Sequence, residues 1–211
     1  MSQTNILDNF LISLSERESS NIVYNHYRDK DIRNNLRLYF EYLLLHWNDV
    51  LVVGETPGYR GCRLTGIPFA SGEIIKKCQH EIFKEIRSKI KLNETSCENT
   101  ATILWSYLRN HSSVSVFWNA FPFHPHKYGI PESNRKPTTS ELEEGKQYLK
   151  AVYCLFQPKR LCSLGRIGEA VLRETFPNER IEYIRHPSYG GKKNCIEGLE
   201  KILGRIKYRS C

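Results

Sequence analysis

The sequence predicts an α/β fold in which a mostly parallel sheet is covered by helices on both faces. Short runs of apolar and β-branched residues alternate along the chain with segments whose apolar residues recur at helical spacing. Glycine and proline residues mark the turns between the two kinds of segment. This alternation is typical of strand–helix–strand units, which bind ligands beyond the carboxyl ends of their strands.

The elements are expected in the following order. Residues 5–47 form two or three helices, because their apolar residues, such as Leu36, Tyr39 and Phe40, share one helical face. Strands are expected at residues 49–53, 114–118, 159–163 and 181–184. Helices are expected at residues 72–90, 99–109, 138–156, 165–175 and 193–206, the third of them with Ser140 and Glu143 as its capping box.

Length and composition predict one domain over residues 1–211, with the helices of residues 1–48 packed on it. The chain has 211 residues and 40% hydrophobic content, enough for one core. The sequence shows no apolar run long enough to span a membrane, and its first residues lack the basic and apolar regions of a secretory signal. We therefore expect a protein of the cytoplasm, associated with the nucleoid in a prokaryote, or of the nucleus in a eukaryote. A monomer is the default expectation for its oligomeric state.

Charge and cysteine content narrow the partners. A net charge of +8 favours a polyanion such as DNA. The seven cysteines include no C-x-x-C pair, so we expect reduced thiols and no metal site. The chain also lacks a P-loop and a dinucleotide-binding glycine fingerprint, which excludes the commoner nucleotide-binding classes.

The loop after the first strand is the first candidate for the site. Gly54, Pro57 and Gly58 let the backbone turn tightly and approach a flat ligand, and Glu55 supplies a carboxylate that can orient water. Phe69, a little further on, is suited to stack on a base. The alternative is a tight surface turn with Phe69 in the core.

Two further loops follow the second and fourth strands. Asn119 offers one acceptor and two donors, which match the O4 and N3–H edge of uracil, although a lone Asn after a strand is often a turn former. The segment 121–125 is expected to form a rigid wall, and His124 and His126 are equally compatible with exposed loop positions. His186 is placed to donate a hydrogen bond to charge that develops on a leaving base, although a lone His is often structural.

The residues around His186 are those that a base-extruding loop requires. A ring of wedge size, close backbone approach and phosphate-binding charge occur together here. The residues are Ser188, Tyr189, Gly190, Lys192 and Lys193, and Tyr59 and Arg60 of the first loop join them as expected DNA contacts.

Together these segments resemble the uracil-DNA glycosylase superfamily, and most closely its single-strand-selective monofunctional branch. The resemblance rests on Gly54-Glu55-Thr56-Pro57-Gly58 with the Thr65–Phe69 continuation, on Asn119–Pro122, on Gly165–Glu169 and on His186-Pro187-Ser188. It implies a three-layer α/β/α fold with a four-stranded parallel sheet, no cofactor or metal, and hydrolysis of the N-glycosidic bond of an extruded nucleotide, most readily uracil. It also implies that Phe69 stacks on the base, Asn119 reads its Watson–Crick edge and His186 stabilises the departing anion at O2.

One position of the sequence departs from that family pattern. Thr56 stands where the branch has a water-activating Asn and the best-known uracil enzymes have Asp, and Thr is not a base. Glu55 is then the residue expected to position water, as in branches with a Gly-Glu-x-Pro-Gly motif, but without the iron–sulfur cluster that those branches often hold. Gly58 stands where the strictest uracil enzymes have a bulky Tyr that excludes 5-methyl groups, so xanthine, hypoxanthine and oxidised pyrimidines are rival substrates to uracil.

Two other functions stay open at this point. The first is a non-catalytic reader of damaged DNA that kept the pocket but lost chemistry at Thr56. The second is a hydrolase of free nucleosides built on a similar sheet, which cleavage of free deoxyuridine would support.

Overall fold

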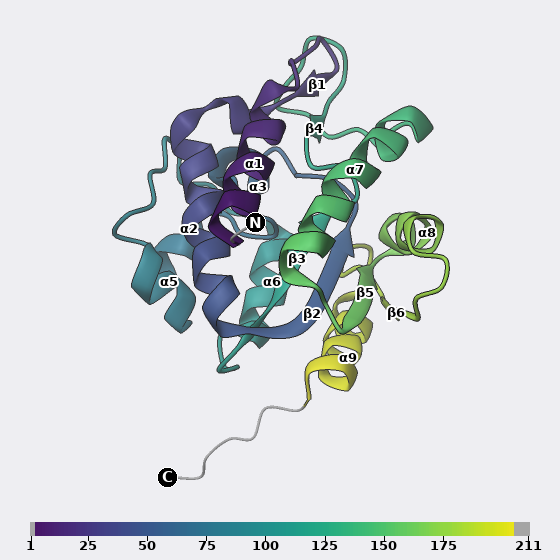
Figure 1. The fold of residues 1–211 in the computed structure, drawn as a ribbon. Helices are drawn as coiled ribbons and strands as arrows, with labels where there is room; N and C mark the ends of the chain where they lie inside the picture. Colours follow the sequence, from purple (N-terminus) through teal and green to yellow (C-terminus); the bar gives the residue numbers. More distant parts are fainter. Residues whose placement is uncertain (1–2, 205–211) are drawn as a thin grey trace.

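The computed structural model describes residues 3–204, and its central element is a four-stranded parallel sheet in the order β3-β2-β5-β6 (Figure 1). Neighbouring strands are parallel in all three pairings. Each strand begins and ends within two residues of its predicted limits. The strands are β2 (Trp47–Gly54), β3 (Val114–Asn119), β5 (Arg160–Leu164) and β6 (Ile181–Ile184).

Helices surround the sheet, as the sequence predicts. They are α1 (Gln3–Glu16), the 3-10 helix η1 (His26–Arg28), α2 (Lys30–His46), α3 (Cys62–Thr65), α4 (Gly72–Lys77), α5 (Glu81–Ile86), α6 (Asn99–Leu108), α7 (Thr139–Phe156), α8 (Arg166–Thr175) and α9 (Lys192–Leu203). The chain moves one way along the sheet from β2 to β3 and the other way from β3 to β5 and β6. Because such crossovers are right-handed, the helices between β2 and β3 cover one face, and α7 and α8 cover the other. Contacts place α1 beside α7 and α9 beside α6.

The middle of the sheet is buried on both faces. In β2 the apolar run Val50–Val53 is at most 3% exposed, as expected for a strand with helices on either side. An aromatic cluster joins the N-terminal helices to the sheet: the Trp118 ring centroid lies 5.4 Å from that of Phe10 in α1 and 5.9 Å from that of Phe40 in α2. The N-terminal helices therefore pack on the sheet. The extent of a single domain over all 211 residues stays a prediction.

The predicted helix at 72–90 is wrong, because the structure divides it into α4 and α5. His80 lies at the break and accepts the Ile82 backbone N–H through Nδ1 at 3.1 Å, which caps the start of α5. The chain bends at Cys78, whose backbone is extended. No proline or glycine marks this break in the sequence. The apolar residues keep helical spacing on both sides of it, so the sequence predicts one continuous helix.

The predicted capping box of α7 is wrong by two residues. Thr138 accepts the Glu141 backbone N–H at 3.2 Å, and Glu141 accepts the Thr138 backbone N–H at 2.7 Å. Ser140 and Glu143 have the same spacing. Arg135 decides between the pairs, because its guanidinium binds both carboxylate oxygens of Glu141, at 2.7 and 3.0 Å.

Two smaller differences concern a short strand pair and the end of the last helix. The structure adds a short antiparallel pair, β1 (Val23–Tyr24) with β4 (His124–Pro125), that the sequence did not predict. Helix α9 ends at Leu203, and the predicted extension to Ile206 lies outside the described residues. None of the described helices is long and apolar enough to cross a membrane. The six cysteines in the described part of the chain are free thiols.

Candidate active site

The first two predicted loops leave the sheet side by side. Gly54 and Asn119 are paired at the carboxyl ends of β2 and β3. Hydrogen bonding continues past the strands, from the Ala120 N–H to the Gly54 carbonyl at 2.9 Å and from the Phe121 N–H to the Glu55 carbonyl at 3.1 Å. The backbone that carries Glu55 is therefore held by the sheet ladder.

Phe69 lies over Gly54 in an uncommon backbone conformation. A Cβ at residue 54 would overlap the Phe69 ring, which explains the glycine at the end of β2. Phe69 has φ 56°, a left-handed value that is unfavourable for a bulky side chain. The Trp105 indole N–H holds it there by donating to the Phe69 carbonyl at 3.1 Å. The ring is half-buried, so it is only partly a core residue.

His186 is hydrogen-bonded in a way that fixes its tautomer. The Ser188 backbone N–H lies 3.2 Å from Nδ1, and the Ser188 hydroxyl lies 2.8 Å from the same atom. An N–H donor facing Nδ1 requires an unprotonated nitrogen there, so the neutral ring carries its proton on Nε2. Burial, together with the neighbouring charge of Arg185, lowers the pKa of His186, which favours this neutral form. The ring therefore offers one N–H donor, from Nε2.

Two glycines of the Gly165–Glu169 segment let other elements approach. Gly165 has φ 94°, and a Cβ there would lie 3.3 Å from Cβ of His186. A Cβ at Gly168 would overlap the Val53 carbonyl, so α8 packs directly on the end of β2. The segment brings the His186 loop close to the end of β2.

A cavity of about 390 Å³ collects several of the predicted residues. Its size lies within the range of roughly 300 to 1,000 Å³ common for small-ligand sites. Glu55, Thr56, Gly58, Phe69, His186 and Tyr189 line it. Two of the three predicted loops, those after β2 and β6, thus meet at one place, as the sequence predicts for residues that follow parallel strands.

The electrostatics of the cavity favour a carboxyl group that exchanges protons. Burial raises the pKa of Glu55, and the nearby charge of Lys136 opposes that shift. A carboxyl group whose pKa moves toward neutrality is better suited to accept a proton from water than an ordinary exposed one. Thr56 lies beside it in the cavity wall, where its hydroxyl can bind water but cannot act as a base.

Asn119 is the predicted residue that the structure places differently from the rest. It is 2% exposed at the end of β3 and is not part of the cavity wall, nor are Gly54 and Pro57. A base reaches the Asn119 amide only by entering as far as the sheet edge. Its role in reading a base stays a prediction.

The predicted DNA contacts lie around the mouth of the cavity. Tyr189 is 97% exposed at φ 50°, and Gly190 follows at φ 74° with open space around it. Lys192 and Lys193 are exposed in the first turn of α9. Tyr59 and Arg60 line a neighbouring cavity of about 250 Å³. These placements suit a protruding ring flanked by basic side chains, and the contacts themselves stay predictions.

Sequence reasoning missed one acidic residue in this site. Glu98, just before α6, lines both cavities, and burial raises its pKa to about 7. The polar loop Asn134–Lys136 also forms part of the larger cavity. Neither segment follows a strand, so the rule that located the other residues did not reach them.

His124 and His126 are buried, at 0% and 2% exposure, so exposed loop positions are excluded for both. His124 lies between two carbonyls: Nδ1 is 2.8 Å from the Pro57 oxygen and Nε2 is 3.0 Å from the Pro131 oxygen. It connects the first loop to the segment that leads into residues 134–136. The neighbouring Phe121 and Phe123 are fully buried, as a rigid wall requires.

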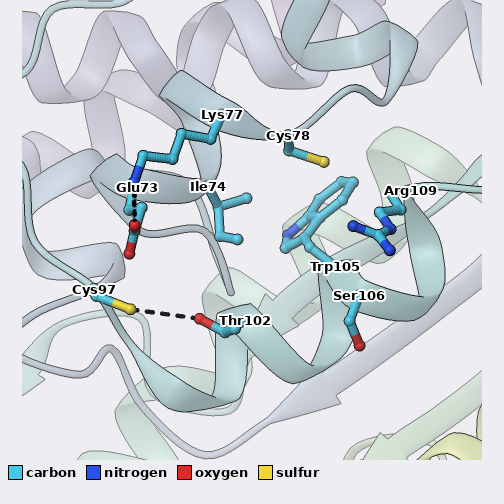
Figure 2. Close-up of a pocket in the computed structure, with 9 residues that line it drawn as sticks. All are labelled: Glu73, Ile74, Lys77, Cys78, Cys97, Thr102, Trp105, Ser106 and Arg109. Atoms are coloured by element: carbon cyan, nitrogen blue, oxygen red, sulfur yellow. Dashed lines mark hydrogen bonds and ion pairs between the residues drawn. The ribbon is translucent and has the colours of Figure 1, made fainter.

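A third hollow, of about 270 Å³, lies between α4 and α6 (Figure 2). Figure 2 shows the Glu73–Lys77 ion pair and the Cys97–Thr102 contact on one side of the Trp105 ring, and Arg109 on the other. It contains none of the predicted site residues. The candidate active site is therefore the cavity at the carboxyl edge of the sheet.

The fold and the site define an α/β protein whose ligand cavity lies where parallel strands end. A sequence model of the uracil DNA glycosylase superfamily matches residues 48–199, which is most of the chain. The chain therefore belongs to the uracil DNA glycosylase superfamily, which confirms the resemblance found in its motifs.

A solved structure agrees with this assignment at the level of the fold. The wild-type SMUG2 of Pedobacter heparinus superposes with a TM-score of 0.68 over 93% of this chain and 96% of that chain, at 15% sequence identity. No curated protein matches the sequence.

Proposed function

We propose that this protein is a monofunctional DNA glycosylase that hydrolyses the N-glycosidic bond of an extruded damaged base, with uracil as its first substrate. The observation that carries the proposal is the His186 tautomer. Its Nε2–H is a fixed, uncharged donor in a cavity that also holds the Glu55 carboxyl. Such a preorganised donor stabilises charge that grows on a leaving group.

The chemistry then runs as a water-dependent displacement. The oxygen of a water molecule bonds to C1′ of the deoxyribose as the bond from C1′ to the base nitrogen breaks. The electron pair leaves with the base, where the His186 Nε2–H stabilises it. Glu55 holds the water and accepts its proton, and Thr56 is placed to share in positioning it. The products are the free base and an abasic site.

Tyr189 supports the extrusion step that this chemistry needs. A base inside a duplex is out of reach, and turning it out costs a few kcal/mol of stacking and pairing. An exposed ring at the cavity mouth is suited to occupy the vacated space. Exposed Lys192 and Lys193 are suited to bind the flanking phosphates. DNA is accordingly the proposed partner, in whichever compartment holds it, and the protein acts as a monomer.

The test is incubation of the purified protein with labelled oligonucleotides that carry uracil, single-stranded and opposite guanine, followed by alkali to cut abasic sites. Strand cleavage that is lost in His186→Ala and Asn119→Ala and retained in His46→Ala, an exposed histidine on α2, supports the proposal. Uncut strands at high enzyme concentration contradict uracil as the substrate, and panels with xanthine, hypoxanthine and oxidised pyrimidines then test the rival bases.

Two further measurements separate the neighbouring possibilities. Lys136 lines the cavity, so a lyase would use its amine to form a Schiff base with the sugar. Borohydride should trap no protein–DNA adduct if water is the nucleophile.

The absence of Asn or Asp at position 56 favours a second candidate function, a non-catalytic reader of damaged DNA. Such a protein would bind uracil-containing DNA without releasing any base.

A further inference from the structure

The carboxyl group of Glu98 is half-buried in the cavity wall and has no partner from the described part of the protein. Glu98 is the N-cap residue of α6, but its side chain does not cap the helix. Instead the carboxyl group turns to the first loop, with Oε1 3.5 Å from the position of a Cβ on Gly58. A Cβ on Gly61 would overlap Oε2. Among residues 3–204 the Glu98 carboxyl group forms no hydrogen bond or ion pair.

The position of Glu98 gives that group access to a ligand. It lies where two cavities meet, one with Phe69 and His186 in its wall and the other with Tyr59 and Arg60. The glycines at 58 and 61 leave the carboxyl group uncovered by side chains of the first loop. A carboxyl group that faces a cavity without a protein partner can exchange the water that it contacts for a ligand that enters the cavity.

The surroundings of Glu98 determine its protonation. Glu55, Arg135, Lys136, His186 and Tyr189 share the larger cavity, and Tyr59, Arg60 and Cys97 share the smaller one. The charge of Glu98 also contributes to the raised pKa of Cys62 in α3. None of these groups offsets the effect of burial, which raises the pKa of Glu98 to about 7. Near neutral pH a large fraction of the carboxyl groups therefore carries a proton.

We propose that Glu98 contacts the extruded base and, in its protonated form, donates a hydrogen bond to a carbonyl oxygen of that base. The inference rests on the proposed function in requiring that a base enters this cavity. A neutral carboxyl group has an O–H to donate, whereas an ionised one presents only lone pairs that repel a carbonyl oxygen. Base recognition should therefore weaken as the pH rises through neutrality.

The experiment measures binding rather than catalysis. The probe is an oligonucleotide with 2′-fluorodeoxyuridine, whose glycosidic bond resists hydrolysis, and the reference is the same strand with a tetrahydrofuran abasic analogue. The ratio of the two affinities isolates contacts to the base from contacts to phosphates. We expect this ratio to fall about 3- to 10-fold between pH 6 and pH 8, the effect of one hydrogen bond.

Variants assign the fall to one residue. Glu98→Gln keeps an N–H donor at all pH values, so its ratio should stay high and flat. Glu98→Ala should give a low, flat ratio at both pH values and serves if the glutamine variant folds poorly. Glu132→Gln, which changes an exposed carboxylate, should keep the wild-type fall.

Either of two results overturns the inference: a wild-type ratio that does not change with pH, or a fall that persists in both Glu98 variants. Failure of the proposed function is a separate result, namely no base release from cleavable uracil strands. A protein that fails that test but shows the Glu98-dependent fall is a non-catalytic reader that uses the same contact.

Discussion

Replacing Glu98 by glutamine should make the folded protein more stable at alkaline pH, whether or not the protein is an enzyme. Burial raises the pKa of Glu98 from 4.5 to about 7. Below pH 4.5 the group is protonated in both the folded and the unfolded chain, so it does not affect their balance. As the pH rises toward 7 the unfolded chain loses the proton first, and the folded state is progressively destabilised. Glutamine has no proton to lose and escapes this effect.

The size of the effect follows from the shift in pKa. At about 1.4 kcal/mol for each pKa unit, the shift corresponds to at most ~3.5 kcal/mol. Because the side chain is half-buried and retains contact with water, we expect a gain of about 1 to 2 kcal/mol in the free energy of unfolding between pH 4.5 and pH 8.

The assay is urea unfolding of the wild-type protein and Glu98→Gln across this pH range, with Glu132→Gln as the exposed control. The stability difference between Glu98→Gln and wild type should grow with pH, while the control difference stays flat. A constant difference, or one that shrinks with rising pH, would refute the burial argument.

Three other predictions concern the candidate site. His186→Ala should lower single-turnover base release about 10²- to 10³-fold, the usual effect of removing one preorganised donor, with little change in DNA affinity; a change below threefold would contradict the assigned tautomer role. Gly54→Ala should cost about 1 to 3 kcal/mol in thermal or urea unfolding, because its Cβ needs the space of the Phe69 ring, and an unchanged stability would show that the ring moves freely. Tyr189→Ala should slow release from duplex DNA more than from single strands, because only the duplex needs a wedge; equal slowing of both would argue against extrusion by this ring.

The sequence predicted the sheet well because its signal is local. Strands buried on both faces need continuous apolar runs. The apolar run Val50–Val53, followed directly by a glycine turn, therefore indicates a buried strand. Helix breaks were harder to predict. The break at Cys78 depends on the His80 side chain capping α5, and either of two Thr or Ser residues could have begun α7 until Arg135 selected the Glu141 pair.

The candidate site was predicted in so far as its residues follow strands. Glu55, Thr56 and His186 lie at one edge because parallel strands end together. Glu98 depends on how the start of α6 packs against Gly58 and Gly61, a tertiary contact that no local pattern records. The only sequence signal for it is an acidic residue immediately before a helix, which is common on protein surfaces.

The hydrogen bonds that continue the sheet ladder into the first loop distinguish two halves of the site, one held by the sheet and one not. The half with Glu55 shares backbone bonds with residues 120 and 121, so it moves only as far as the sheet moves. The half with Tyr189 and Gly190 has open space around it and two consecutive residues in the left-handed region. The loop with Tyr189 and Gly190 should therefore be the part that adapts to different DNA strands. It should also tolerate natural or engineered insertions better than the half with Glu55. The geometry of the water and the base is then preserved while the way the strand is gripped changes.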